Sequence, residues 1–128
     1  MTSAIERFAG ENYVSLTTYR RDGTGVPTPV WCAAEGDALY VWTEAEAGKV
    51  KRIRRRADVT VAACSFRGKL RSEPIPGRAD ICDAAASEHA RGLIKKKYGW
   101  LGWLTVGLSV RRRGPAGSVG LRVTFPAE

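Results

Sequence analysis

Residues 39–56 read LYVWTEAEAGKVKRIRRR, and this stretch is the strongest indication of the fold because a strand, a short link and a helix follow one another in it. Residues 39–43 are aromatic and β-branched, which is typical of a strand. Residues 44–48 end in a glycine, and six of the next eight residues are lysine or arginine. A helix that begins there presents free N–H groups and a partial positive charge, which suit a phosphate. That phosphate could belong to a small cofactor or to a nucleic acid, or the basic run could simply face solvent.

The rest of the chain predicts a mainly β fold with minor α content. Turn signals such as the pair Asp22 and Gly23 separate short runs of alternating apolar and polar residues. A helix is expected over residues 84–98 with a stop at Gly99, then an apolar connection over 100–110 and a basic loop over 111–118. The expected strands are residues 13–19, 26–33, 39–43, 58–66, 70–82 with interruptions, and 119–125. Hairpin-linked strands of this kind are typical of a small antiparallel barrel, here a single domain over residues 1–128.

Two prolines mark the second expected strand. Pro27 and Pro29 are two residues apart, so both remove an N–H from the same edge of the strand. That edge cannot carry a full hydrogen-bond ladder and is expected to stay partly open. An open edge beside a phosphate-binding helix would suit a flat heterocyclic ligand, although edge protection against aggregation explains the same prolines.

Composition narrows the classes of function. The net charge of +8 predicts attraction to anions, and no stretch is apolar enough to span a membrane. The three cysteines are far apart, so we expect buried thiols, no metal site and a cytoplasmic location. The single histidine, His89, has no visible catalytic partner. No catalytic side chain is predicted, and an enzyme of this sequence would take its reactive group from a cofactor.

Five stretches in this order resemble the pyridoxamine 5'-phosphate oxidase-like family of FMN-binding split β-barrels. They are residues 26–30 (VPTPV), 37–43 (DALYVWT), 48–54 (GKVKRIR), 58–63 (DVTVAA) and 77–79 (GRA). The sequence is most similar to the actinobacterial branch of F420-dependent oxidoreductases, F420 being a deazaflavin. The resemblance implies a six-stranded antiparallel split β-barrel that forms a homodimer, with two cofactor sites at the subunit interface.

The resemblance also implies which residues bind the cofactor. Thr43 would lie at its phosphate region, and Lys49 would pair with the phosphate. The strand segment along the flavin or deazaflavin ring would be Thr28, Pro29, Val30 and Trp31. Further cofactor contacts are expected from Val50, Lys51, Arg54 and Arg78, and a residue of the partner chain, Trp100 or Trp103, would close the site.

Two departures from the family pattern favour F420 over FMN. Members that use FMN often have an arginine or lysine on the second strand, where this chain has Pro27 and Cys32. They also commonly have a serine–arginine pair just before the lysine, where this chain has Gly48 without the arginine. F420 has a longer anionic tail of phosphate and glutamates, which suits additional surface cations.

Three functions follow as hypotheses. The first is an F420-dependent oxidoreductase that transfers a hydride between the bound cofactor and a small organic substrate, with an FMN-binding oxidoreductase as its alternative. The second is a non-catalytic F420-binding or carrier protein on the same fold. The third, nucleic-acid binding, has only the charge in its favour, because no DNA- or RNA-binding module is recognisable. We therefore expect no nucleic-acid partner, and we expect Arg52, Arg55 and Arg56 to be solvated.

Overall fold

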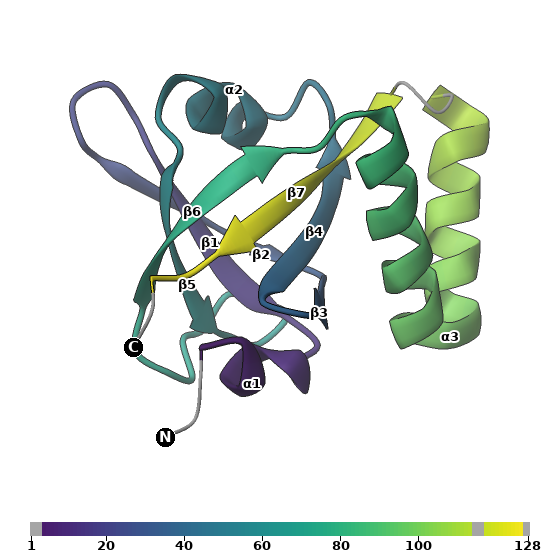
Figure 1. Ribbon diagram of the computed structural model, residues 1–128, viewed down its shortest axis with the longest axis horizontal. Helices are drawn as coiled ribbons and strands as arrows, with labels where there is room; N and C mark the ends of the chain where they lie inside the picture. The colour runs from purple at the N-terminus through teal and green to yellow at the C-terminus, as the bar shows by residue number, and fades with distance from the viewer. Residues whose placement is uncertain (1–3, 114–116, 127–128) are drawn as a thin grey trace.

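The computed structural model describes residues 4–113 and 117–126, and for residues 100–113 it describes the backbone alone. In this part of the chain seven antiparallel strands form one sheet in the order β2-β1-β5-β6-β7-β4-β3 (Figure 1). The strands are β1 (Val14–Tyr19), β2 (Gly25–Val30), β3 (Cys32–Glu35), β4 (Ala38–Glu44), β5 (Asp58–Ala63), β6 (Ile75–Ile81) and β7 (Ser118–Thr124).

The two end strands of this sheet are consecutive in the chain. Only Trp31 separates β2 from β3, yet β2 pairs with β1 and β3 pairs with β4. Because one residue joins the two ends, the sheet must curl into a barrel. The predicted antiparallel split barrel is confirmed, and its expected second strand over residues 26–33 is divided at Trp31. Counting the two halves separately gives seven strands where six were expected.

Alternating apolar side chains fill the barrel, and short helices cover its two ends. Val14 and Leu16 of β1 point inward, as the alternation over residues 13–19 predicted, and are fully buried. α1 (Ala4–Ala9) inserts Phe8 at one end, and α2 (Gly48–Arg55) covers the opposite end (Figure 1). The buried core also contains Val30, Cys32, Leu39, Val41, Ile53, Val59, Val61, Ala63, Ala79, Leu121 and Val123.

A long helical hairpin packs against the outer face of β4 and β7. It is α3 (Ala84–Arg113), whose first turn is capped by Asp83 through a 2.8 Å bond from the Ala86 amide. Gly99 has a positive φ of 61° and breaks the helix, as predicted, and the second half runs back beside the first (Figure 1). The expected connection over 100–110 and the expected loop from 111 are wrong, because the chain turns at Gly99 and then resumes a helix up to Arg113. No proline interrupts that second half.

The segment between β5 and β6 is a loop and not a pair of long strands. β5 ends at Ala63 instead of residue 66, and β6 begins at Ile75 instead of residue 70. A single bridge between Cys64 and Leu70 holds the intervening turn, where Gly68 has a φ of 88°. Pro74 cannot donate to a ladder, so regular pairing starts only after it. The loop is thereby free to fold back beside the outer face of the sheet.

Replacement of Gly120 by alanine is expected to loosen the contact between α3 and the barrel. A Cβ at Gly120 would lie 2.8 Å from the Ala90 Cβ and 3.3 Å from the Ser87 Cα, which are rigidly placed helix atoms. Overpacking of this kind costs about 1–3 kcal/mol. Urea denaturation followed by circular dichroism should show this loss for Gly120→Ala. Gly92→Ala is the matched control, because a Cβ there meets nothing within 4 Å, and an equal loss in both variants would contradict tight packing at Gly120.

Candidate cofactor site

Thr43 and Lys49 meet at the junction of β4 and α2. The Lys49 Nζ donates to the Thr43 Oγ1 at 3.1 Å. Thr43 is buried, and Lys49 is half-buried at the first turn of the helix. An ammonium group has three donors, so a lysine that serves one hydroxyl can also bind a second acceptor. The pairing of these two residues agrees with the site that the sequence predicted at this junction.

The surroundings of Lys49 favour a bound anion. Burial lowers the pKa of Lys49, the nearby charge of Arg52 lowers it further, and Glu44 opposes both effects. Burial acts by penalising the charged form, and an anion beside the ammonium would offset that penalty. Ala47, the residue before α2, provides no side-chain cap, and the first turn of the helix contains no acidic residue. The first-turn N–H groups and the helix dipole thus add to the charge of Lys49.

Arg52 lies beside Lys49 at this helix start. Its Nε donates to the Oγ1 of the fully buried Thr18 at 2.6 Å. Its Nη1 lies over Gly48, where an added Cβ would be only 2.9 Å away. The expectation that Arg52 is simply solvated is therefore wrong, because the missing side chain of Gly48 lets the guanidinium fold over the N-terminal turn.

The exposed arginines at the end of α2 also contact the protein. Arg55 donates to the Tyr19 carbonyl at 3.1 Å, and the Arg56 guanidinium lies 4.6 Å from the centre of the Tyr19 ring. Arg56 further pairs with Asp58 at 3.4 Å. Both arginines remain largely exposed, as expected, while helping to fix the end of β1.

The side chains of four other predicted contact residues have surroundings different from those of Thr43 and Lys49. Each helical residue turns the side-chain direction by about 100°, which puts residues 51 and 54 on a different side of α2 from residue 49. Lys51 and Arg54 are both exposed there. Val50 is fully buried and donates its amide to the Ala47 carbonyl at 3.1 Å, and Arg78 lies on β6 with Asp80 at 3.6 Å.

The strand segment predicted to lie along the ring is the free edge of the sheet. β2 is an end strand whose only ladder partner in the described residues is β1. Pro27 and Pro29 cannot donate to that ladder, so its amide donors must come from the alternate residues Val26, Thr28 and Val30. The open edge therefore presents carbonyl oxygens, and the prediction of an open edge is confirmed.

The side chains of this segment divide between three environments. Val30 is buried in the core, Thr28 is half-buried, and Pro29 is exposed. The Trp31 ring is not directed at the open edge but stacks on Tyr98 of α3, with ring centres 4.2 Å apart and planes within 8°. Trp31 can thus take part in ligand binding through its backbone while its ring anchors α3. The side chains of Trp100 and Trp103 lie outside the described residues.

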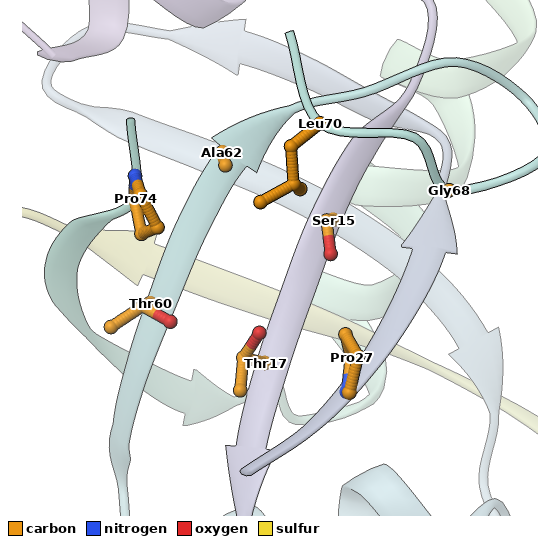
Figure 2. A pocket seen from close by; sticks show the side chains of 8 residues that line it. All are labelled: Ser15, Thr17, Pro27, Thr60, Ala62, Gly68, Leu70 and Pro74. Carbon is orange, nitrogen blue, oxygen red and sulfur yellow. The ribbon is translucent and has the colours of Figure 1, made fainter. Parts of the chain in front are cut away.

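A pocket of about 270 Å³ lies on the outer face of β1, β2 and β5, next to this edge (Figure 2). The loop between β5 and β6 overhangs it through Gly68, Leu70 and Pro74. The remaining lining residues are Ser15, Thr17, Pro27, Thr60 and Ala62. None of the eight carries an ionisable side chain. The sequence did not identify this pocket, although the outward-facing alternation of residues 13, 15 and 17 was visible.

Other kinds of site find no support in the described residues. No group of three or more His, Cys, Asp or Glu side chains is arranged to hold a metal ion there. Among the same residues, no helix has the length and apolar character needed to cross a membrane. His89 contacts Glu35 at 2.5 Å on the outside of the barrel, away from the pocket lining. Cys32 and Cys64 are buried free thiols, and burial raises the pKa of Cys32 to about 11.

In the described part of the chain, a curled antiparallel sheet is closed where β2 leads into β3 and is covered by α1, α2 and α3, which makes it a split β-barrel. No protein-family model matches this chain, and a search of curated proteins finds no match. Solved structures do match. A conserved hypothetical protein from Mycobacterium tuberculosis aligns with a TM-score of 0.73 at 18% identity, over 99% of this chain and 82% of that one.

Two further structures illustrate the range of ligands on this fold. An F420 reductase aligns with a TM-score of 0.65 at 18% identity, over 99% of this chain and 97% of that one. The heme storage protein HutZ from Vibrio cholerae aligns with a TM-score of 0.68 at 13% identity, over 97% and 89%. At these identities the likeness establishes the fold and leaves the ligand and the activity open.

Proposed function

We propose that this protein binds a phosphate-bearing flavin-type cofactor, F420, and acts as an oxidoreductase. The observation that carries the proposal is the half-buried ammonium of Lys49, bonded to Thr43 at the uncapped start of α2. A cationic side chain, a hydroxyl and free helix amides together match the oxygen atoms of a phosphate. Arg52, held over Gly48, adds a second cation at the same helix turn.

The ring of the cofactor would lie along the open edge of β2, from Thr28 to Trp31. That edge offers backbone groups for hydrogen bonds to the polar rim of a flavin or deazaflavin. The exposed cations Lys51, Arg54 and Arg78 would then face the longer anionic tail of F420, which FMN lacks. Val50 would contribute by fixing the helix through its buried side chain.

The chemistry in this proposal belongs mainly to the cofactor, which when bound in reduced form supplies a hydride. Lys49 and Thr43 hold the phosphate end, and the edge of β2 orients the ring. The neighbouring pocket has mainly apolar walls and no ionisable lining residue, so it keeps water away from a small planar substrate without acid–base catalysis by the protein.

A titration distinguishes F420 from FMN. Purified protein is titrated separately with each cofactor, and binding is followed by the change in cofactor fluorescence. We expect tighter binding of F420, because FMN lacks the anionic tail that would face Lys51, Arg54 and Arg78. Tighter binding of FMN would contradict the choice of F420 and leave the phosphate site in place.

A turnover assay separates an enzyme from a carrier. The reduced cofactor is incubated with the protein and a panel of quinones, enones and tetrapyrroles, and its oxidation is followed by absorbance. We expect at least one acceptor to be reduced faster than in a protein-free control. Tight binding without acceptor-dependent oxidation would favour a non-catalytic carrier and contradict the enzyme.

We further propose a homodimer that uses the face around the pocket. Phe66 and Leu70 are the large apolar side chains most exposed in the described residues, at 63% and 52%, and both belong to the loop that overhangs the pocket. A second subunit placed here would cover them and complete the cofactor site.

Leu70→Asp is expected to shift the protein from dimer to monomer, because it would bury a carboxylate in the interface. Analytical ultracentrifugation measures the change, with Lys96→Asp, at an exposed position of α3, as a control outside this loop. A wild-type protein that is monomeric at micromolar concentration, or a Leu70→Asp variant that stays dimeric, would contradict this interface.

A further inference from the structure

A second pocket, of about 360 Å³, lies between the start of β7 and the first turns of α3. These two segments lie side by side at the edge of the barrel that carries α3 (Figure 1). The wall of this second pocket includes Arg91 and Glu88 of α3, Ser118 of β7 and Ala45 from the loop after β4. The candidate cofactor site described above does not use these side chains.

The wall of this pocket contains two buried polar atoms without a hydrogen-bond partner. They are the Nε of Arg91 and the Oγ of Ser118. The Arg91 side chain is only 7% exposed, and Ser118 is 6% exposed as a residue. Leaving a buried donor unsatisfied is costly, and folded proteins do so rarely. Two such atoms on one wall indicate that a ligand acceptor completes the site.

The carboxylate that pairs with the Arg91 guanidinium can leave it. Glu88 accepts from the Arg91 Nη1 at 2.5 Å, but its side chain is 65% exposed and one turn away on the same helix. Only the Glu88 side of this ion pair is exposed, so Glu88 can swing into solvent when another acceptor takes its place and keeps the buried guanidinium paired. The Ser87 hydroxyl, which also lines the pocket, already has partners within the protein. It accepts from the Gly120 amide at 3.0 Å and donates to the Cys82 carbonyl at 3.4 Å.

The charges around the pocket select the type of anion. Besides Arg91 and Glu88, the lining includes Asp83, whose carboxylate already accepts the Ala86 amide and lies at the positive end of α3. The two carboxylates would repel a doubly charged phosphate. A planar carboxylate carries a single charge and matches the flat edge of a guanidinium.

We propose that this pocket binds the carboxylate group of a small organic acid. The Arg91 Nε and the Ser118 Oγ donate to its oxygens, and Glu88 moves out to solvent. The carboxylate could come from a free acid or from the glutamate tail of a cofactor, and the two sources are separable. The site does not depend on the proposed oxidoreductase activity.

Nuclear magnetic resonance of the Arg91 Nε–H group tests the proposal directly. Uniformly 15N-labelled full-length protein is titrated with propionate, with propionamide and with inorganic phosphate, and the Arg91 signal is assigned by its loss in Arg91→Lys. We expect a saturable shift with propionate that exceeds those with propionamide and phosphate. Absence of a saturable shift with propionate, or an equal response to propionamide, would overturn the proposal.

Two variants that leave Arg91 in place keep the test independent of folding defects. Ser118→Ala should weaken propionate binding about tenfold, because one hydrogen bond to a charged group is lost. Glu88→Gln should strengthen it by about threefold to tenfold, since it removes the competing carboxylate. Glu73→Gln, exposed and outside the pocket lining, is the control. Weaker binding in Glu88→Gln would contradict displacement of Glu88.

A final titration with F420 identifies the source of the carboxylate. A shift of the Arg91 Nε–H signal by F420 that blocks the response to propionate assigns the site to the cofactor tail. A propionate response that persists at saturating F420 assigns it to a separate acid. If F420 fails to bind anywhere, the proposed function fails while the propionate result still decides this pocket.

Discussion

Lys49→Met is expected to weaken cofactor binding by roughly 30- to 150-fold, which corresponds to the loss of about 2–3 kcal/mol from a charge-assisted bond. The half-buried ammonium is bonded to Thr43 and lies at the uncapped start of α2, so its charge acts where screening by water is weak. Methionine keeps the length and apolar stem of the side chain and removes only the charge and its donors. Fluorescence titration with F420 gives the dissociation constants of the wild type and the variant.

Arg55→Met is the matched control for this experiment. Arg55 is exposed at the end of the same helix and on a different side from Lys49, so its loss should weaken binding by no more than about threefold. Equal losses in both variants would mean that the helix attracts anions only through its net charge. Such a result would contradict a defined phosphate site at Thr43 and Lys49.

Leu121→Ala is expected to lower the free energy of unfolding by about 2–5 kcal/mol. Leu121 is fully buried in β7, where it lies opposite Val41 of β4 and Ile81 of β6. Truncation leaves a cavity between three strands that cannot collapse around it. Urea denaturation followed by tryptophan fluorescence or circular dichroism measures the change.

Arg122→Ala serves as the control at the next position of the same strand. Arg122 points to the outside and pairs with the exposed Asp37 at 3.3 Å, an interaction worth at most about 1 kcal/mol. A loss in Arg122→Ala as large as that in Leu121→Ala would contradict the inward and outward alternation assigned to β7.

The barrel could be predicted from the sequence because alternation and turn residues are local signals. Residues 13–19, 39–43 and 119–125 form strands close to the expected limits. The division of the second strand at Trp31 was not predictable in this way, because it depends on a partner distant in the chain. Trp31 leaves the sheet where its ring can stack on Tyr98, and this contact exists only after α3 has docked.

The second half of α3 shows a different limit of the sequence. Residues 100–110 are apolar and contain two glycines, which favoured a connection over a helix. Helical propensity is a weak signal, and tertiary context overrides it. Gly99 was correctly identified as the end of one helix, but a stop signal does not indicate whether another helix begins directly after it.

Part of the candidate site could be predicted because it depends on residues that are close together in the sequence. Thr43 and Lys49 are joined by a short link, so a strand with a helix after it brings them together without any distant contact. Arg52 was missed because its role depends on Thr18 of β1 and on the absence of a side chain at Gly48. A glycine one turn before an arginine is the signal that could have indicated it.

A crystal structure of the protein with F420 bound would test the phosphate site at Thr43 and Lys49 by giving the distance between the phosphate oxygens and the Lys49 Nζ. We predict a distance of about 2.7–2.9 Å, with a second phosphate oxygen at the Thr43 Oγ1 and the ring along residues 28–31. A phosphate beyond hydrogen-bonding distance of both side chains would contradict the assignment of the site.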